Sequence, residues 1–219
     1  MKFLSKFISI SNLKLLLLLI ALLTIYSFTC AFSYVNAIST NIEDSVFRLH
    51  VIANSDSEED QNLKYIVRDK VLEYINNISN NETSKEDIIF LVNENINEIK
   101  TIAENTILEN GYNYSVKLNI GNFAFPTKSY GDISFPAGYY DALKIEIGKA
   151  KGQNWWCVMF PPLCFVDVTN GIVPEESKNI IKENLSSEEY DLISGNNNTT
   201  FKFKIVELFQ NLSIKLAQV

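Results

Sequence analysis

The stretch Gly152–Cys164, GQNWWCVMFPPLC, places two adjacent tryptophans, two cysteines and a Pro-Pro step within thirteen residues. Neighbouring residues of a strand point to opposite faces of a sheet, so Trp155 and Trp156 need apolar cover on different faces. Burying one indole removes about 150–250 Å² from water, which is worth roughly 4–6 kcal/mol as an upper bound. We therefore predict a strand over 154–160 that is covered on both faces, by this chain's own elements or by another protein.

Before this strand, the spacing of the apolar residues alternates between the period of a strand and the period of a helix. A serine stands at the start of each of the two helices predicted there. The spacing of Ser55 and Glu58 predicts a capping box, and Ser84 with Asp87 marks a second helix start. The predicted elements are a strand at 42–52, helices at 57–78 and 85–108, strands at 112–120 and 140–147, and a short helix at 175–185.

Consecutive strands usually pair with each other, which favours antiparallel pairing among the later strands. The predicted fold class is therefore α+β, a mainly antiparallel sheet with two consecutive helices packed on one face. Residues 201–219 predict a C-terminal amphipathic helix that covers the other face and one tryptophan, although FKFKI at its start alternates like a strand.

The N-terminus has the pattern of a targeting segment. Lys2, Lys6 and Lys14 are followed by an uncharged run of 23 residues, Leu15–Ala37. A membrane span needs about 20 apolar residues, and a signal peptide with cleavage after Ala37 fits the same run. We expect residues 1–37 to be a signal peptide or a membrane anchor, and residues 38–219 to be an exported domain.

The exported part is strongly acidic. Removing Lys2, Lys6 and Lys14 from the 19 basic residues leaves 16 against 26 acidic residues, a net charge of −10. Such a surface repels nucleic acid and anionic lipid headgroups. The composition therefore favours a protein or a small neutral ligand as the partner.

Two of the three cysteines lie outside the targeting segment. In one continuous strand, Cys157 and Cys164 would be about 23 Å apart, well beyond the ~7 Å limit between Cα atoms for a disulfide. Pro161 and Pro162 can fold the segment back, because proline fixes φ and interrupts strand pairing. We predict a disulfide between the two cysteines in an oxidising compartment, with two separately buried thiols as the alternative.

Catalytic chemistry is restricted by the presence of a single histidine. A cysteine peptidase or wall hydrolase of the cell envelope would have to pair His50 with Cys157 or Cys164. The sequence has no H-E-x-x-H motif, G-x-S-x-G motif or Cys/His cluster, so we predict no metal and no cofactor.

The connection from Phe123 to Tyr140 is rich in aromatic residues, prolines and glycines. Aromatic side chains on a stiff loop dominate many protein interfaces. The alternative is that this loop packs over its own core, and both can hold for different residues. The candidate partner-binding residues are Phe125, Tyr130, Phe135, Tyr139, Trp155 and Trp156.

Three segments carry a family resemblance: RLHVIANSDSEEDQNLKYIVRDKVL at 48–72, FPTKSYGDISFPAGYYDALKIEIGKAKGQNWWCVMFPPLCFVD at 125–167, and KFKIVELFQ at 202–210. They resemble stage II sporulation protein R. The resemblance implies a signalling protein of endospore formation, exported from the forespore into the intermembrane space, that is not a catalyst. It further implies that the protein triggers a membrane-embedded aspartic protease, which then processes the precursor of the mother-cell sigma factor E.

Our leading functional hypothesis is therefore an exported intercellular signal that acts on a membrane protease. The envelope enzyme that uses His50 with Cys157 or Cys164 is the alternative, and a structural envelope component is a third reading. The sequence leaves open the cleavage of residues 1–37, the contact surface and the oligomeric state.

Overall fold

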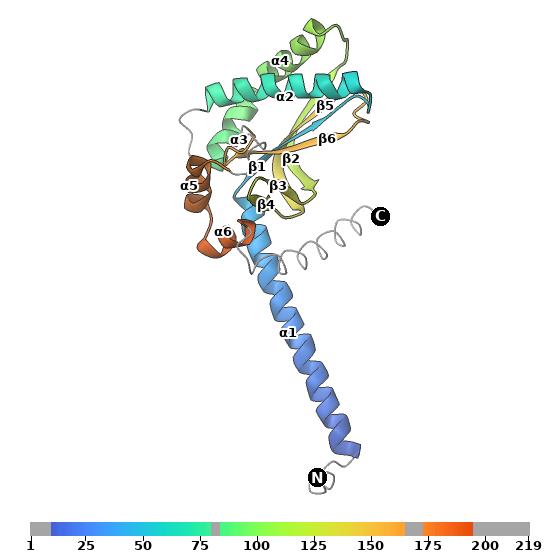
Figure 1. Cartoon of the computed structure of the whole chain (residues 1–219), viewed down its shortest axis with the longest axis vertical. Coiled ribbons are helices and arrows are strands. Elements are labelled where there is room, and N and C mark those ends of the chain that lie inside the picture. Colours follow the sequence, from blue (N-terminus) through green and yellow to red (C-terminus); the bar gives the residue numbers. More distant parts are fainter. Residues whose placement is uncertain (1–9, 80–83, 165–172, 195–219) are drawn as a thin grey trace. The chain divides into compact units, whose positions relative to one another are not determined.

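The computed structural model describes residues 10–79, 84–164 and 173–194, and divides the chain into two compact units, Met1–Thr40 and Asn41–Val219 (Figure 1). Helix α1 (Ile10–Asp44) makes up the described part of the first unit and contributes its last four residues to the second. Within α1, Leu13–Ala31 has a mean hydropathy of 2.2 and none of its side chains is buried. Its length and composition fit a membrane span, and a signal sequence would have the same properties.

Strand β1 (Phe47–Ile52) begins later than the sequence predicts, because residues 42–44 belong to α1. Helical hydrogen bonding continues to Ser45, whose N–H donates to the Asn41 carbonyl at 3.0 Å. Both Ile42 and Val46 are buried, so this helix end is part of the domain core.

Helix α2 (Glu58–Ile78) starts as predicted in position but with a different cap. Ser57, not Ser55, accepts a hydrogen bond from the Asp60 N–H. The Ser55 hydroxyl instead donates to the Asp60 carboxylate, so both serines act on the same residue. The predicted capping box of Ser55 with Glu58 is wrong, because Ser57, two residues further along the chain, is the residue that caps the helix.

The predicted helix at 85–108 consists of two helices, α3 (Lys85–Glu94) and α4 (Ile96–Glu109). Ser84 caps α3 as predicted and accepts from the Asp87 N–H at 3.1 Å. Asn95 stands between the helices, where its amide donates to the Leu91 carbonyl and its Oδ1 accepts from the Tyr74 hydroxyl. Such side-chain hydrogen bonds compete with the helical ladder, which accounts for the break.

The four-stranded sheet has the order β2-β5-β1-β6. Its remaining strands are β2 (Val116–Phe125), β5 (Gly138–Ile147) and β6 (Asn154–Phe160). β2 and β5 pair antiparallel, as do β1 and β6, whereas β1 and β5 are parallel. The predicted α+β class with a mainly antiparallel sheet is confirmed.

Helices α2, α3 and α4 cover one face of this sheet, and Figure 1 shows α2 and α4 above the strands. Phe47, Leu49 and Val51 of β1 point toward these helices, together with alternate residues of β5. The apolar stripes of the helices complete a single buried core, which includes Leu63, Val67, Val71, Val92, Ile99, Ala103 and Ile107. The prediction of helices on one face is confirmed.

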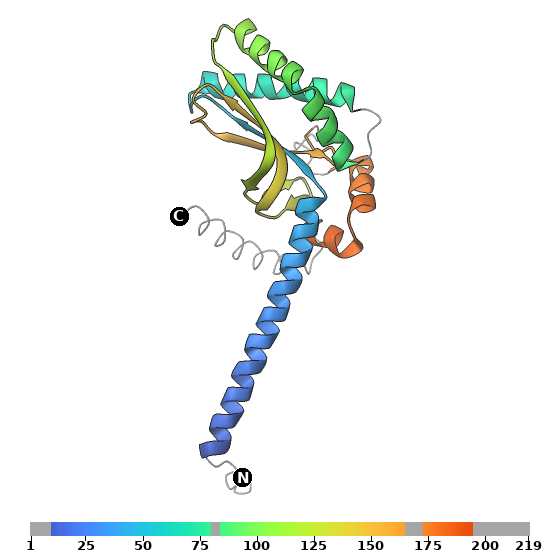
Figure 2. The same cartoon turned by 180° about the vertical axis from the view of Figure 1, so that it is seen from behind.

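A small hairpin covers the opposite face, as Figures 1 and 2 show. Its strands, β3 (Lys128–Tyr130) and β4 (Ile133–Phe135), lie in the aromatic connection between β2 and β5. The predicted C-terminal helix at 201–219 lies outside the described residues. The hairpin provides the second cover that the sequence analysis assigned to that helix.

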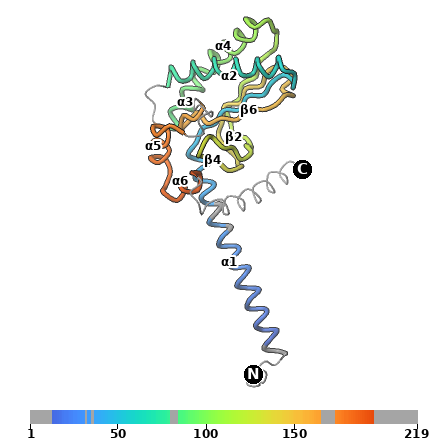
Figure 3. Tube along the Cα trace, in the orientation of Figure 1, coloured from blue at the N-terminus to red at the C-terminus, as the bar shows by residue number. Residues whose placement is uncertain are grey.

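After β6 the chain forms α5 (Glu175–Asn184) and α6 (Ser187–Ile193), and α6 lies beside β4 (Figure 3). The Asp132 carboxylate, in the hairpin turn, pairs with the Lys178 ammonium at 2.7 Å and accepts from the Val173 N–H at 2.9 Å. The Ser177 hydroxyl donates to the Pro162 carbonyl at 3.0 Å. Helix α5 therefore holds both the hairpin and the chain that follows β6.

Candidate partner-binding cleft

The two tryptophans of β6 are covered on opposite faces by this chain itself. Trp155 lies on the helix side, edge-on to the Tyr65 ring at 5.5 Å and with the Arg68 guanidinium 4.2 Å from its centroid. Trp156 lies on the hairpin side, stacked on His50 at 3.7 Å and edge-on to Phe125 at 4.7 Å. The predicted two-sided cover is confirmed, yet both indoles stay half-buried and keep exposed area.

Arg48 lies at the centre of the hairpin face and is fully buried. Its guanidinium carbon is 4.2 Å from the Phe125 centroid, 4.7 Å from that of Tyr140 and 5.9 Å from that of Phe135. The face of an aromatic ring attracts a cation more strongly when water is excluded. These three rings therefore offset part of the free-energy cost of removing the Arg48 guanidinium from water. The strand that contains Arg48 is predictable from periodicity, but this cage is not, because its rings come from residues 77 or more positions away.

Tyr130 connects this buried cation to the sheet edge. Its hydroxyl accepts from Arg48 Nη2 at 2.8 Å and donates to the Trp156 carbonyl at 3.1 Å. Burial is the largest influence on this hydroxyl and raises its pKa, while the positive charge of Arg48 acts in the opposite direction. The hairpin is thereby fixed against both β1 and β6.

The predicted disulfide between Cys157 and Cys164 is confirmed, with Cα atoms 5.4 Å apart. The chain reverses at Pro161 and Pro162, and the Leu163 N–H donates to the Val158 carbonyl at 3.1 Å. The alternative of two separate thiols is therefore excluded for this structure. The bridge brings Leu163 and Cys164 beside β6, where they form part of a cleft.

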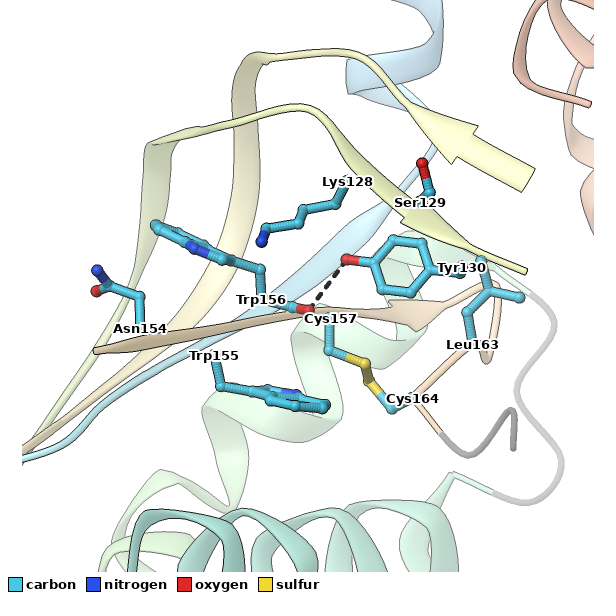
Figure 4. A pocket seen from close by; sticks show the side chains of 9 residues that line it. All are labelled: Lys128, Ser129, Tyr130, Asn154, Trp155, Trp156, Cys157, Leu163 and Cys164. Carbon is cyan, nitrogen blue, oxygen red and sulfur yellow. Dashed lines mark hydrogen bonds between the residues drawn. A yellow bond between two sulfur atoms is a disulfide. The ribbon is translucent and has the colours of Figure 1, made fainter. Parts of the chain in front are cut away.

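This cleft lies between β3, β6 and the disulfide-bridged turn, and has a volume of about 200 Å³ (Figure 4). In Figure 4, Trp156, Tyr130 and Lys128 lie on one side of the β6 ribbon, and Trp155 with the disulfide on the other. The residues that line it are Lys128, Ser129, Tyr130, Asn154, Trp155, Trp156, Cys157, Leu163 and Cys164.

Most of the polar side chains that line the cleft have partners, but within the described residues the buried Trp155 Nε1–H has none. The Ser129 hydroxyl lies 2.7 Å from that of Ser134, and Asn154 Oδ1 lies 2.7 Å from His50 Nε2. Tyr130 makes the two hydrogen bonds described above. In the described part of the chain, the Lys128 ammonium has no hydrogen bond and no ion pair. It is also the cleft's one charged group, and sequence analysis did not single it out because an isolated lysine carries no pattern.

The six predicted partner-binding residues separate into three groups. Tyr130, Trp155 and Trp156 meet at the cleft. Tyr139 is 42% exposed on β5 and lies outside the cleft lining. Phe125, at the end of β2, and Phe135, in β4, are 1% and 0% exposed, so they fill the interior and offer no surface to a partner. The alternative that the loop packs on its own core therefore describes these two side chains.

The envelope-enzyme alternative needs a thiol, and the disulfide leaves neither Cys157 nor Cys164 in that form. Burial of the His50 ring lowers the pKa of its imidazole to about 4, although the hydrogen bond that His50 Nε2 donates to Asn154 Oδ1 favours the charged form. Within the described residues, no three His, Cys, Asp or Glu side chains gather as metal ligands would. The required Cys–His pair is not formed in this arrangement.

The model of the family described as stage II sporulation protein R matches residues 43–170 of this chain. That range contains the four-stranded sheet, the three helices α2, α3 and α4 that cover it, the hairpin and the disulfide. The chain belongs to the stage II sporulation protein R family. Membership confirms the predicted resemblance and implies a role in sporulation.

A curated relative supports the same assignment. Stage II sporulation protein R of Bacillus subtilis (strain 168) is 42% identical over 137 residues, which are 63% of this chain and 61% of the relative. The chain thus spans about three-fifths of that relative's length in the match. No solved structure matches this family member.

Proposed function

We propose that this protein is an exported signal of endospore formation that activates a membrane-embedded aspartic protease, which then processes the precursor of sigma factor E. The family match over residues 43–170 is the observation that carries this proposal. The N-terminal apolar helix supports export, either as a signal sequence or as an anchor.

The surface chemistry fits a protein ligand better than a catalyst. The domain places an apolar cleft beside two half-buried tryptophans, and tryptophan and tyrosine are enriched among the residues that dominate binding energy. Activation requires that the signal bind the active state of the protease more tightly than the inactive state. A shift from 1:99 to 99:1 needs about 5.5 kcal/mol of differential affinity, which a few aromatic contacts supply.

The partner-binding assignment is retained for Trp155, Trp156, Tyr130 and Tyr139, which keep exposed area. Phe125 and Phe135 are left out because they are buried.

The test is processing of the sigma factor E precursor in sporulating cells that carry a deletion of this gene. We expect the precursor to accumulate in the deletion strain and to be processed again when the wild-type protein is restored. Immunoblots of precursor and product give the processed fraction. Normal processing in the deletion strain would show that the protein has another role.

A matched pair of substitutions tests the surface. Trp156→Ala should reduce processing, whereas Phe90→Ala should not, because Phe90 is 64% exposed on α3 and does not line the cleft. Both variants must be exported at the wild-type level. Full processing by Trp156→Ala would remove this side chain from the proposed contact.

A further inference from the structure

We propose that the cleft between β3 and β6 binds a segment of the partner protein in which an acidic residue stands beside a bulky apolar residue. The carboxylate would pair with Lys128, and the apolar side chain would enter the cleft. This inference rests on the proposed function and specifies the chemistry by which the partner is recognised.

The size of the cleft favours side chains over a small-molecule ligand. Pockets for drug-sized ligands and cofactors typically hold about 300–1,000 Å³. The 200 Å³ found here is below that range and suits one or two inserted side chains. In many protein interfaces, a single large side chain of one partner inserts into a pocket of the other, and this cleft has a suitable size for that.

The walls of the cleft are mainly apolar. The lining includes Trp155, Trp156, Leu163 and the two cysteines of the disulfide, and it is more apolar than polar. An aliphatic or aromatic side chain that enters removes apolar area from water at roughly 25 cal/mol per Å². The walls therefore select a bulky apolar residue.

The charge in the cleft selects an acidic neighbour for that residue. Lys128 is half-buried, lines the cleft, and has no partner among the residues that the structure describes. The chain as a whole has a net charge of −7, which repels an acidic partner segment. Lys128 provides a local positive charge that attracts such a segment. A carboxylate beside Lys128 is stabilised more than at an exposed site, because the cleft walls limit screening by water.

The sheet edge argues against addition of a whole strand to β6. The Trp156 carbonyl already accepts from the Tyr130 hydroxyl, and the Val158 carbonyl accepts from the Leu163 N–H. Strand addition depends on free main-chain groups along an edge. Because two carbonyls of this seven-residue strand are occupied, recognition falls to side chains.

The cleft walls are held in place before any partner arrives. Arg48 fixes Tyr130 on one side of the hairpin, and Lys178 holds Asp132 at its turn. The disulfide fixes the opposite wall. A preformed site loses little conformational freedom on binding, so contacts made there convert efficiently into affinity.

The test compares two charge reversals in full-length protein in sporulating cells. Lys128→Glu should lower the rate of sigma factor E precursor processing by at least about tenfold, because it places like charges together. Lys117→Glu makes the same charge change on β2, at the opposite edge of the sheet, and should leave the rate within about twofold.

Equal processing by the two variants would overturn this inference while the proposed function stands. Normal processing after deletion of the gene would instead refute the proposed function itself. Where Lys128→Glu is poorly exported, Lys128→Met tests the same contact without a new charge, and wild-type processing by Met would overturn the inference.

The occupant is identified by a photo-cross-linking residue at Ser129, which is exposed at the rim of the cleft. We expect an adduct with the membrane protease, at a segment where an acid adjoins a bulky apolar residue, and we expect Lys128→Glu to abolish it. An adduct within residues 195–219 of the same chain, an adduct with a second copy, an adducted segment without an acid, or no adduct would each overturn the inference.

Discussion

Arg48 Nη2 donates a hydrogen bond of 2.8 Å to the Tyr130 hydroxyl across a sequence separation of 82 residues. The same hydroxyl donates to the Trp156 carbonyl, so one oxygen atom links the centre of the sheet to the wall of the cleft. Loss of this link would affect both stability and the shape of the cleft.

Tyr130→Phe removes that oxygen and leaves a buried guanidinium donor and a carbonyl without their partner. An unsatisfied buried polar group costs about 1–3 kcal/mol, so we expect the free energy of unfolding to fall by that amount. Urea unfolding followed by tryptophan fluorescence measures it. Tyr139→Phe, at an exposed site, is the control and should change stability by less than about 0.5 kcal/mol. Equal effects of the two variants would contradict the bridging role of Tyr130.

Reduction of the Cys157–Cys164 disulfide should lower the free energy of unfolding by about 2–3 kcal/mol, the range expected for so short a loop. The measurement is urea unfolding with and without dithiothreitol. Iodoacetamide should modify these two cysteines only after reduction. Both measurements use the Cys30→Ser variant, because the exposed free cysteine at position 30 would also react with iodoacetamide. A native protein that alkylates at Cys157 without reductant would revive the enzyme hypothesis.

Gly152→Ala should destabilise the domain by roughly 1–3 kcal/mol, the usual cost of forcing extra atoms into a packed site. A Cβ at Gly152 would overlap the backbone carbonyl of Ser55, which has no freedom to rotate away. Gly121→Ala is the matched control, because its Cβ would meet Phe123 no closer than 3.5 Å. The midpoints of thermal unfolding distinguish the two variants. Similar midpoints would show that the β5–β6 connection shifts to accommodate the added Cβ.

Glu43 should make stability depend on pH near neutrality. Its carboxyl lies directly against Gly138, and this burial raises its pKa from 4.5 to about 7, although the Tyr139 N–H acts in the opposite direction. A raised pKa means that the fold favours the protonated form. Its contribution to stability is therefore full below about pH 4.5 and is lost as the pH rises through about 7.

Glu43→Gln should flatten this dependence, so that the unfolding midpoints at pH 5 and pH 8 differ less than in the wild type. Glu73→Gln removes a carboxylate that is 62% exposed and should retain the wild-type difference. Identical pH profiles for Glu43→Gln and the wild type would assign the dependence to other groups.

Local patterns in the sequence were enough to predict the tryptophan strand, the helices that cover one face and the disulfide. They failed where two local patterns competed, as with Ser55 and Ser57 at the start of α2. They also missed Asn95, whose side chain breaks a stripe that is continuous in apolar periodicity.

The sequence by itself determined that Trp155 and Trp156 need cover on opposite faces, because alternation along a strand is a local geometric property. Only the tertiary structure decided that the β3–β4 hairpin covers the second face, that β1 and β5 run parallel, and that Lys128 lies in a cleft with no partner among the residues the structure describes. These outcomes depend on contacts between residues 26 to 113 positions apart, and periodicity carries no information about such pairings.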